Sequence, residues 1–282
     1  MLPVAEVRPE EKAVGALEHT EGILDAIREQ GVAVLHNCID PSVCELLQAP
    51  LYADAQRMLE GSFWPPQPER GALGNGHVNL GAPRCAPWVH SDVVGNPIVE
   101  QVVAAAIGTG AVLGFYNGLC NLSGSRPQPL HLGSAWAWQT EAEAEAAGQE
   151  WPPSATTLAV YIAVDDIDAS NGAEEVWPGS HRDTAAATLS AGEALTGGGV
   201  EDRRRLSPPT RLVIPKGSVA FVDARLWRRV SLQCSAPLGR HPLPRLPACL
   251  SAELHRNGAG RVEFRCPATA NGGPDVRRTG LG

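Results

Sequence analysis

The chain has 282 residues, of which 43% are hydrophobic and 19% are charged, and its formal net charge is −8. This length suits one large domain, and an acidic chain without a long basic run gives little support to nucleic-acid binding. The seven cysteines include no CxxC pair, which argues against a disulfide scaffold or a zinc cluster. The charged N-terminus lacks the apolar core of a signal peptide, and no apolar run is long enough to span a membrane. We therefore expect a soluble, cytoplasmic protein.

Local signals place helices mainly in the first part of the chain. Thr20 can cap a helix that Gly31 stops, and Asp40-Pro41 pairs a capping residue with a proline at the first helical position. Asn96-Pro97 repeats this start signal. We expect helices over residues 20–30, 40–59 and 96–108, a buried strand over 31–39, and a loop over the Gly- and Pro-rich stretch 62–88.

Apolar and β-branched segments separated by turn residues dominate from about residue 111. The expected strands are 111–122, 156–167, 174–181, 210–227, 248–254 and 262–266. The Ala- and Glu-rich stretch 139–150 predicts a surface helix, whereas 183–202, which includes three consecutive glycines, predicts a mobile loop. Helices first and strands later, without βαβ alternation, predict an α+β fold with an antiparallel sandwich or jelly roll. We expect a single domain over 1–282, helical over about 1–110 and jelly-roll over about 111–270.

Four phrases in order carry a family resemblance. They are GVAVLHNCIDPSVCELL (31–47), FYNGLCNLSGSRPQPLH (115–131), VDDIDASNGAEEVWPGSHRDT (164–184) and PKGSVAFVDARLWRR (215–229). Together they resemble the phytanoyl-CoA dioxygenase family of Fe(II)/2-oxoglutarate-dependent oxygenases, and most of all a fungal branch that acts in secondary metabolism. The resemblance implies a double-stranded β-helix, which is a jelly roll, flanked by N-terminal helices.

The resemblance also implies where a metal site should lie. The family holds Fe(II) with an H-x-D or H-x-E pair and a distal His, but the matching phrase here is His131-Leu132-Gly133, and Arg228 stands in place of the distal His. A guanidinium has no lone pair to give to iron near neutral pH. Only His131 is retained, because Gly133 and Arg228 replace the other two ligands. Asn117 and Asn121 precede His131 and are expected to line the same former active-site pocket.

The co-substrate side departs from the family pattern as well. The family grips the far carboxylate of 2-oxoglutarate with an Arg after the distal His, and Arg240 or Arg245 is the nearest candidate. A literal H-x-D occurs at His90-Ser91-Asp92 and offers a relocated metal pair as an alternative. His181 is expected to stabilise a turn and Asp223 to order a strand end. We therefore expect no cofactor, with Fe(II) and 2-oxoglutarate only if the family chemistry survives.

Three functions follow from this reading. The first is a non-catalytic partner subunit that pairs with an active homologous dioxygenase as a heterodimer, in natural-product and possibly meroterpenoid biosynthesis. The second is a stand-alone, metal-independent isomerase or cyclase that uses His131 as acid or base and Arg228 as an anion stabiliser, with a small molecule bound in the old pocket. The third is an active non-heme iron oxygenase with ligands from outside the family pattern. Neither nucleic acid nor membrane is expected as a partner.

Overall fold

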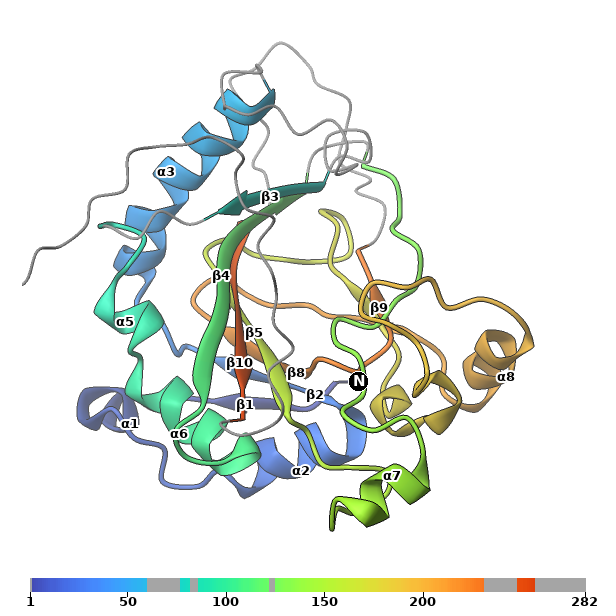
Figure 1. The fold of residues 1–282 in the computed structure, drawn as a ribbon. Helices are drawn as coiled ribbons and strands as arrows, with labels where there is room; N and C mark the ends of the chain where they lie inside the picture. Colours follow the sequence, from blue (N-terminus) through green and yellow to red (C-terminus); the bar gives the residue numbers. More distant parts are fainter. Residues whose placement is uncertain (1, 60–76, 82–85, 122–124, 231–247, 257–282) are drawn as a thin grey trace, which may run out of the picture.

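The computed structural model describes residues 2–59, 77–81, 86–121, 125–230 and 248–256. Its main element is a seven-stranded sheet with the strand order β1-β2-β8-β5-β10-β4-β3. Its strands are β1 (Val4–Glu6), β2 (Val32–His36), β3 (His77–Gly81), β4 (Val112–Asn121), β5 (Thr157–Ala163), β8 (Val219–Asp223) and β10 (Ala248–His255). Among these described strands, β1 and β2 pair in parallel and the other pairs are antiparallel. The result is a mixed α+β fold (Figure 1).

Helices cover one face of this sheet. They are α2 (Glu21–Gln30), α3 (Pro41–Leu59) and α6 (Pro97–Ile107), joined by the short α1 (Pro9–Val14) and α5 (Ser91–Val94). Alternate strand residues such as Val160 and Phe221 meet the apolar sides of these helices in the larger hydrophobic cluster. Asn96 caps α6 by accepting from the backbone N–H groups of Ile98 and Val99, as the Asn-Pro signal predicts.

The opposite face of the sheet packs against a small second sheet. This sheet has the order β7-β6-β9, formed by β7 (Thr210–Arg211), β6 (Glu175–Val176) and β9 (Arg228–Arg229). Side chains of both sheets, among them Tyr161 and Val222 from the large one and Val176 from the small one, form a separate buried cluster. Residues of β5 therefore alternate between the helical side and the space between the sheets.

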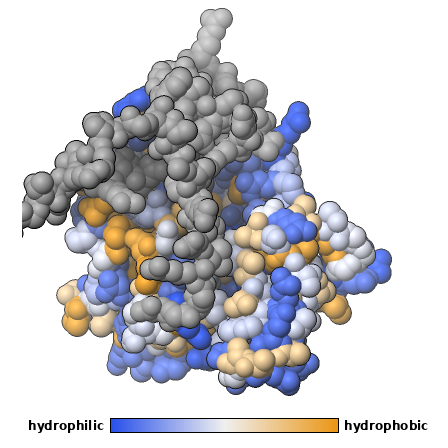
Figure 2. Space-filling model, in the orientation of Figure 1, coloured by the Kyte–Doolittle hydropathy of each residue, from blue (hydrophilic) through white to orange (hydrophobic). Residues whose placement is uncertain are grey.

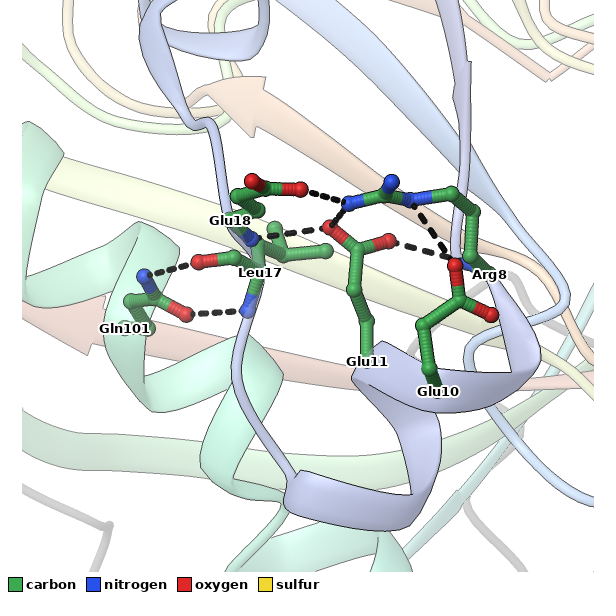
Figure 3. Close-up of polar contacts among 6 residues, drawn as sticks. All are labelled: Arg8, Glu10, Glu11, Leu17, Glu18 and Gln101. Carbon is green, nitrogen blue, oxygen red and sulfur yellow. Dashed lines mark hydrogen bonds and ion pairs between the residues drawn. The ribbon is translucent and has the colours of Figure 1, made fainter.

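Polar contacts join the N-terminal segment to α6 (Figure 3). Gln101 accepts from the Leu17 backbone N–H at 2.7 Å and donates to the Leu17 carbonyl at 3.0 Å. Arg8 pairs with Glu11 at 3.0 Å and also with Glu18, whose backbone N–H donates to Glu11 at 2.8 Å. The Gln101 contacts thus join the segment after α1 to α6, and the contacts of Arg8, Glu11 and Glu18 hold that segment to the start of α1.

Several predicted elements are confirmed, and others need correction. The helices over 20–30, 40–59 and 96–108, the strand over 31–39 and the surface helix, α7 (Glu141–Ala146), are all present. The predicted loop over 62–88 contains β3, and the predicted loop over 183–202 contains the start of α8 (Gly198–Leu206). The single strand expected over 210–227 is divided between β7 and β8, because Pro215 and Gly217 form a turn. The strand expected over 262–266 lies outside the described residues.

The first 110 residues are not simply helical, because they supply β1, β2 and β3 to the large sheet. The two parts of the chain thus share one sheet. Among the described residues, no helix has both the length and the apolar character needed to cross a bilayer.

Candidate functional site at the end of the small sheet

His131 and Arg228 lie directly opposite each other on paired backbone segments. The backbone N–H of each donates to the carbonyl of the other at 3.0 Å, so they form an antiparallel hydrogen-bonded pair. Partners in such a pair project their side chains to the same face of a sheet. Arg228 is held in turn by Val176 on β6, its other neighbour. The fold therefore brings together two residues that are 97 positions apart in the sequence.

The guanidinium of Arg228 fills the space beside Gly133. A Cβ atom placed on Gly133 would lie 2.0 Å from Nη2 and 2.6 Å from Cζ of Arg228. Such distances are far below van der Waals contact, so no side chain fits at position 133 while Arg228 keeps this conformation. The absence of a side chain at Gly133 thus makes room for the Arg228 guanidinium. The guanidinium occupies the volume that a side chain at 133 would take.

Arg228 is buried and charged, with few partners. Its residue is 6% exposed, and its guanidinium carbon lies 5.7 Å from the centre of the Tyr161 ring. Among the described residues, Nε and Nη1 have no hydrogen-bond acceptor. Burial by itself lowers the pKa of Arg228, but Tyr161 and the carboxylates of Glu174 and Glu253 outweigh this effect and raise it. The side chain therefore carries its positive charge inside the protein.

A row of three side chains from the large sheet faces this region. Asn117 on β4 is paired with Ser251 on β10, which is paired with Tyr161 on β5. Residues in register across neighbouring strands lie on the same face, and Tyr161 belongs to the cluster between the sheets. Asn117 is thus buried on the same face of the large sheet as Tyr161. Tyr161 and Ser251 were not predicted as site residues, because strand register cannot be read from local sequence.

Asn121 has a structural role in this arrangement. Its amide nitrogen donates to the Gly172 carbonyl at 3.1 Å, and its amide oxygen lies 3.0 Å from Nδ1 of His77 on β3. The other ring nitrogen of His77 lies 2.6 Å from the Arg126 carbonyl. Asn121 thus connects β3 and the turn at Gly172 to β4, and both polar atoms of its amide take part in these contacts.

Comparison with known proteins identifies the family. The family model described as "Phytanoyl-CoA dioxygenase (PhyH)" matches residues 27–228. The chain belongs to the phytanoyl-CoA dioxygenase family. Two solved structures are similar to it in fold.

AviO1 from Streptomyces viridochromogenes Tue57 is 16% identical, with a TM-score of 0.54 over 87% of this chain and 99% of that one. SnoK, a non-heme alpha ketoglutarate dependent carbocyclase from nogalamycin biosynthesis, is 14% identical, with a TM-score of 0.56 over 84% of each chain.

The described residues do not fit the iron that this family implies. The resemblance places the family ligands at His131, Gly133 and Arg228, and only the first of these side chains can coordinate a metal. The guanidinium also takes the space next to Gly133, where a carboxylate ligand would be needed. Among the described residues, no group of three or more His, Cys, Asp or Glu side chains is arranged to hold a metal ion.

The alternative metal pair at His90 and Asp92 is part of a helix cap. His90 precedes α5, and its Nδ1 accepts from the Asp92 backbone N–H at 3.2 Å. The neighbouring Val93 packs in the cluster on the helical side of the large sheet. His131 lies on the other side of that sheet, beside β9 (Figure 1). The structure therefore does not bring the His90-Ser91-Asp92 phrase to His131.

Two other predicted residues have structural surroundings. His181 is buried, its Nε2 lies 3.0 Å from the Arg28 carbonyl, and desolvation lowers its pKa. Asp223 ends β8 and forms a two-pronged buried pair with Arg225, at 3.0 Å to Nε and 2.7 Å to Nη2. Both therefore fix the turns that lead into the site. The two candidates for 2-oxoglutarate binding, Arg240 and Arg245, lie outside the described residues.

Proposed function

We propose that this chain is a phytanoyl-CoA dioxygenase homologue with a degenerate metal triad, and that it does not carry out iron-dependent oxidation by itself. We further propose that it is the non-catalytic partner subunit of an active homologous dioxygenase in natural-product biosynthesis. The observation that carries the proposal is the Arg228 guanidinium in the space beside Gly133. We infer that the two packed sheets form the double-stranded β-helix of the family. The fungal, meroterpenoid setting remains a prediction.

Electrostatics explains why Arg228 opposes a metal ion. A buried arginine cannot lose its proton near neutral pH, and the neighbouring Glu174 and Glu253 raise the pKa of Arg228 further. At an effective dielectric constant of about 20, a dication roughly 4 Å from a guanidinium would be repelled by about 8 kcal/mol. A single imidazole, His131, offers too little binding energy to offset such a repulsion. The loss of two ligands is therefore made worse by the residue that replaces one of them.

An exposed apolar surface supports the role of a partner subunit. At the start of β4, Val112 is 53% exposed, Leu113 is 42% exposed and Phe115 is 44% exposed. Leu113 also lines an apolar groove of about 420 Å³ between α6 and the helical face of the sheet. Figure 2 shows hydrophobic residues gathered over α5 and the neighbouring part of β4. Leu113 shares the helical face of the sheet with this groove, whereas Phe115 pairs with Glu253 on the other face. Exposed apolar surface of the kind that Leu113 and the groove present is typical of a protein–protein interface.

The metal part of the proposal is tested by iron loading. The purified chain is loaded anaerobically with Fe(II), freed of excess metal, and assayed for bound iron and for 2-oxoglutarate binding by calorimetry. We expect neither to bind stoichiometrically. The double variant Gly133→Asp/Arg228→His rebuilds the family pattern and should gain iron, whereas Gly133→Asp alone should not. Stoichiometric iron and 2-oxoglutarate-dependent oxygen consumption by the unaltered chain would establish the third function, an oxygenase with unusual ligands.

The partner part is tested by co-expression with a homologous dioxygenase whose two-His-one-carboxylate pattern is intact. We expect a heterodimer in size-exclusion chromatography and higher activity than the active subunit has alone. Leu113→Asp should weaken the complex because it places a charge in an apolar contact. Leu206→Asp is the matched control, because Leu206 is 82% exposed on α8, away from this surface. A stable monomer that leaves the activity of its homologue unchanged would contradict the partner role.

One observation favours the second function, a metal-independent isomerase or cyclase. His131 is only partly buried, and its Nδ1 lies 2.8 Å from the Pro129 carbonyl. This contact favours a proton on Nδ1 and leaves Nε2 as an acceptor, so the ring can act as a base beside the charge of Arg228. Turnover under anaerobic conditions with a chelator, abolished by His131→Ala, would support this function. Loss of that turnover on chelation would exclude it.

A further inference from the structure

We propose that Arg228 binds the carboxylate group of a small organic ligand that enters between the two sheets. The site would lie where a member of this family is expected to hold its metal, but it would use a fixed positive charge of the chain. It does not depend on the partner role, because a ligand could bind here in a monomer or in a heterodimer.

Arg228 carries a buried charge that no described residue pairs with. Among the described residues, the buried charged side chains are Glu11, Asp223, Arg225 and Arg228. Asp223 and Arg225 pair with each other at 2.7 Å, and Glu11 pairs with the exposed Arg8 at 3.0 Å. Arg228 forms no ion pair with any described residue, and two of its nitrogens lack acceptors. A buried guanidinium whose N–H groups lack acceptors is costly, so an anion that reaches those groups is bound favourably.

Residues on the side of the large sheet that faces the small sheet are partly exposed to solvent. Leu119 and Cys249 lie within β4 and β10, on the side between the sheets, yet both are only partly buried. Gly133, which lies against the guanidinium, is also only partly buried. Glu174, which directly precedes the central strand β6 of the small sheet, is also only partly buried. The partly exposed surface of Gly133 therefore brings solvent close to the Arg228 guanidinium.

The donors of Arg228 and the groups around them favour one class of ligand. A guanidinium presents paired N–H donors that match the two oxygens of a carboxylate. The carboxylates of Glu174 and Glu253 lie near enough to raise the pKa of Arg228, and they would repel a phosphate dianion more strongly than a monoanion. The neighbouring Tyr161 ring and Leu119 side chain offer apolar surface for the rest of the molecule. These surroundings favour an organic monocarboxylate.

The sequence next to Arg228 supports an external counter-ion. The segment 231–247, SLQCSAPLGRHPLPRLP, follows β9 directly and contains neither Asp nor Glu. It also adds positive charge through Arg240 and Arg245. The segment 231–247 therefore supplies no carboxylate of its own.

The test compares a carboxylate with its uncharged analogue. Binding of hexanoate and of hexanamide is measured by calorimetry and thermal shift, in the presence of a chelator so that metal plays no part. We expect hexanoate to bind and stabilise the protein and hexanamide not to. Arg228→Met should bind hexanoate about 10- to 100-fold more weakly, as expected for the loss of a charge-assisted hydrogen bond. Arg228→Lys should fall between the two, because it keeps the charge but not the paired donors.

Control variants and competing anions decide the outcome. Arg204→Met removes an exposed arginine of α8 and should leave hexanoate binding unchanged. Equal binding of hexanoate by the Arg228→Met variant, equal binding of hexanamide, or no binding to the unaltered chain would each overturn the proposal. Equally strong binding of inorganic phosphate would overturn the assignment to carboxylates. If Arg228→Met does not fold, Arg228→Lys and the amide comparison still decide the question, whatever the iron-loading result.

Discussion

Replacement of Gly133 by alanine should destabilise the protein by steric conflict with Arg228. The added Cβ would lie 2.0 Å from Nη2, whereas nonbonded carbon and nitrogen atoms approach to roughly 3.5 Å, so the guanidinium must move by more than 1 Å. The Ala224 carbonyl oxygen, 3.1 Å from the same Cβ position, limits relief by backbone movement. Because the guanidinium is buried, we expect a cost of about 1–3 kcal/mol in the free energy of unfolding.

A double-mutant cycle measures this conflict directly. Urea denaturation followed by circular dichroism is applied to Gly133→Ala, Arg228→Ala and the double variant. In the Arg228→Ala background the alanine at 133 has room, so the cost should nearly vanish and the coupling energy should reach about 1–3 kcal/mol. Gly199→Ala in α8, where a Cβ meets no atom within 4 Å, is the control and should be neutral or stabilising. A cost below about 0.5 kcal/mol for Gly133→Ala, or no coupling, would refute the reasoning.

Three further predictions concern stability. Asp223→Ala should lower the free energy of unfolding by about 3–5 kcal/mol, because it leaves Arg225 buried without its partner; a loss below about 1 kcal/mol would contradict this. Asn96→Ala should cost about 1 kcal/mol in the same denaturation assay, because α6 loses its cap, and an unchanged midpoint would show that the cap is dispensable. The hydrogen bond from Arg8 lowers the pKa of Glu11 from 4.5 to about 2. The stability that this ion pair contributes to the folded chain is therefore complete above pH 4.5 and is lost as pH falls toward 2. The difference in stability between the unaltered chain and Glu11→Gln should follow that window, and a difference independent of pH would exclude the ion pair.

Local sequence predicted the elements whose signals are local. Asn96-Pro97 and Gly108 mark the start and the end of α6, and Gly31 marks the end of α2. Local sequence can show these boundaries because a helix cap depends on only a few neighbouring residues. Two elements had no such signal. β3 is a short segment with a Gly at its end, and it is a strand because β4 pairs with it. The helix α8 buries none of its residues and begins within three glycines; it is held by Arg203, which donates to the Pro178 carbonyl at 2.6 Å.

The sequence by itself determined the family resemblance and the types of residue at the expected ligand positions, because these are properties of ordered phrases along the chain. Only the tertiary structure placed the Arg228 guanidinium against Gly133 and left its Nε and Nη1 without acceptors among the described residues. It also decided that Tyr161 and Ser251 face this region and that the His90 phrase caps a helix elsewhere. Strand register and side-chain direction depend on contacts between distant segments, and those contacts form only when the two sheets pack together.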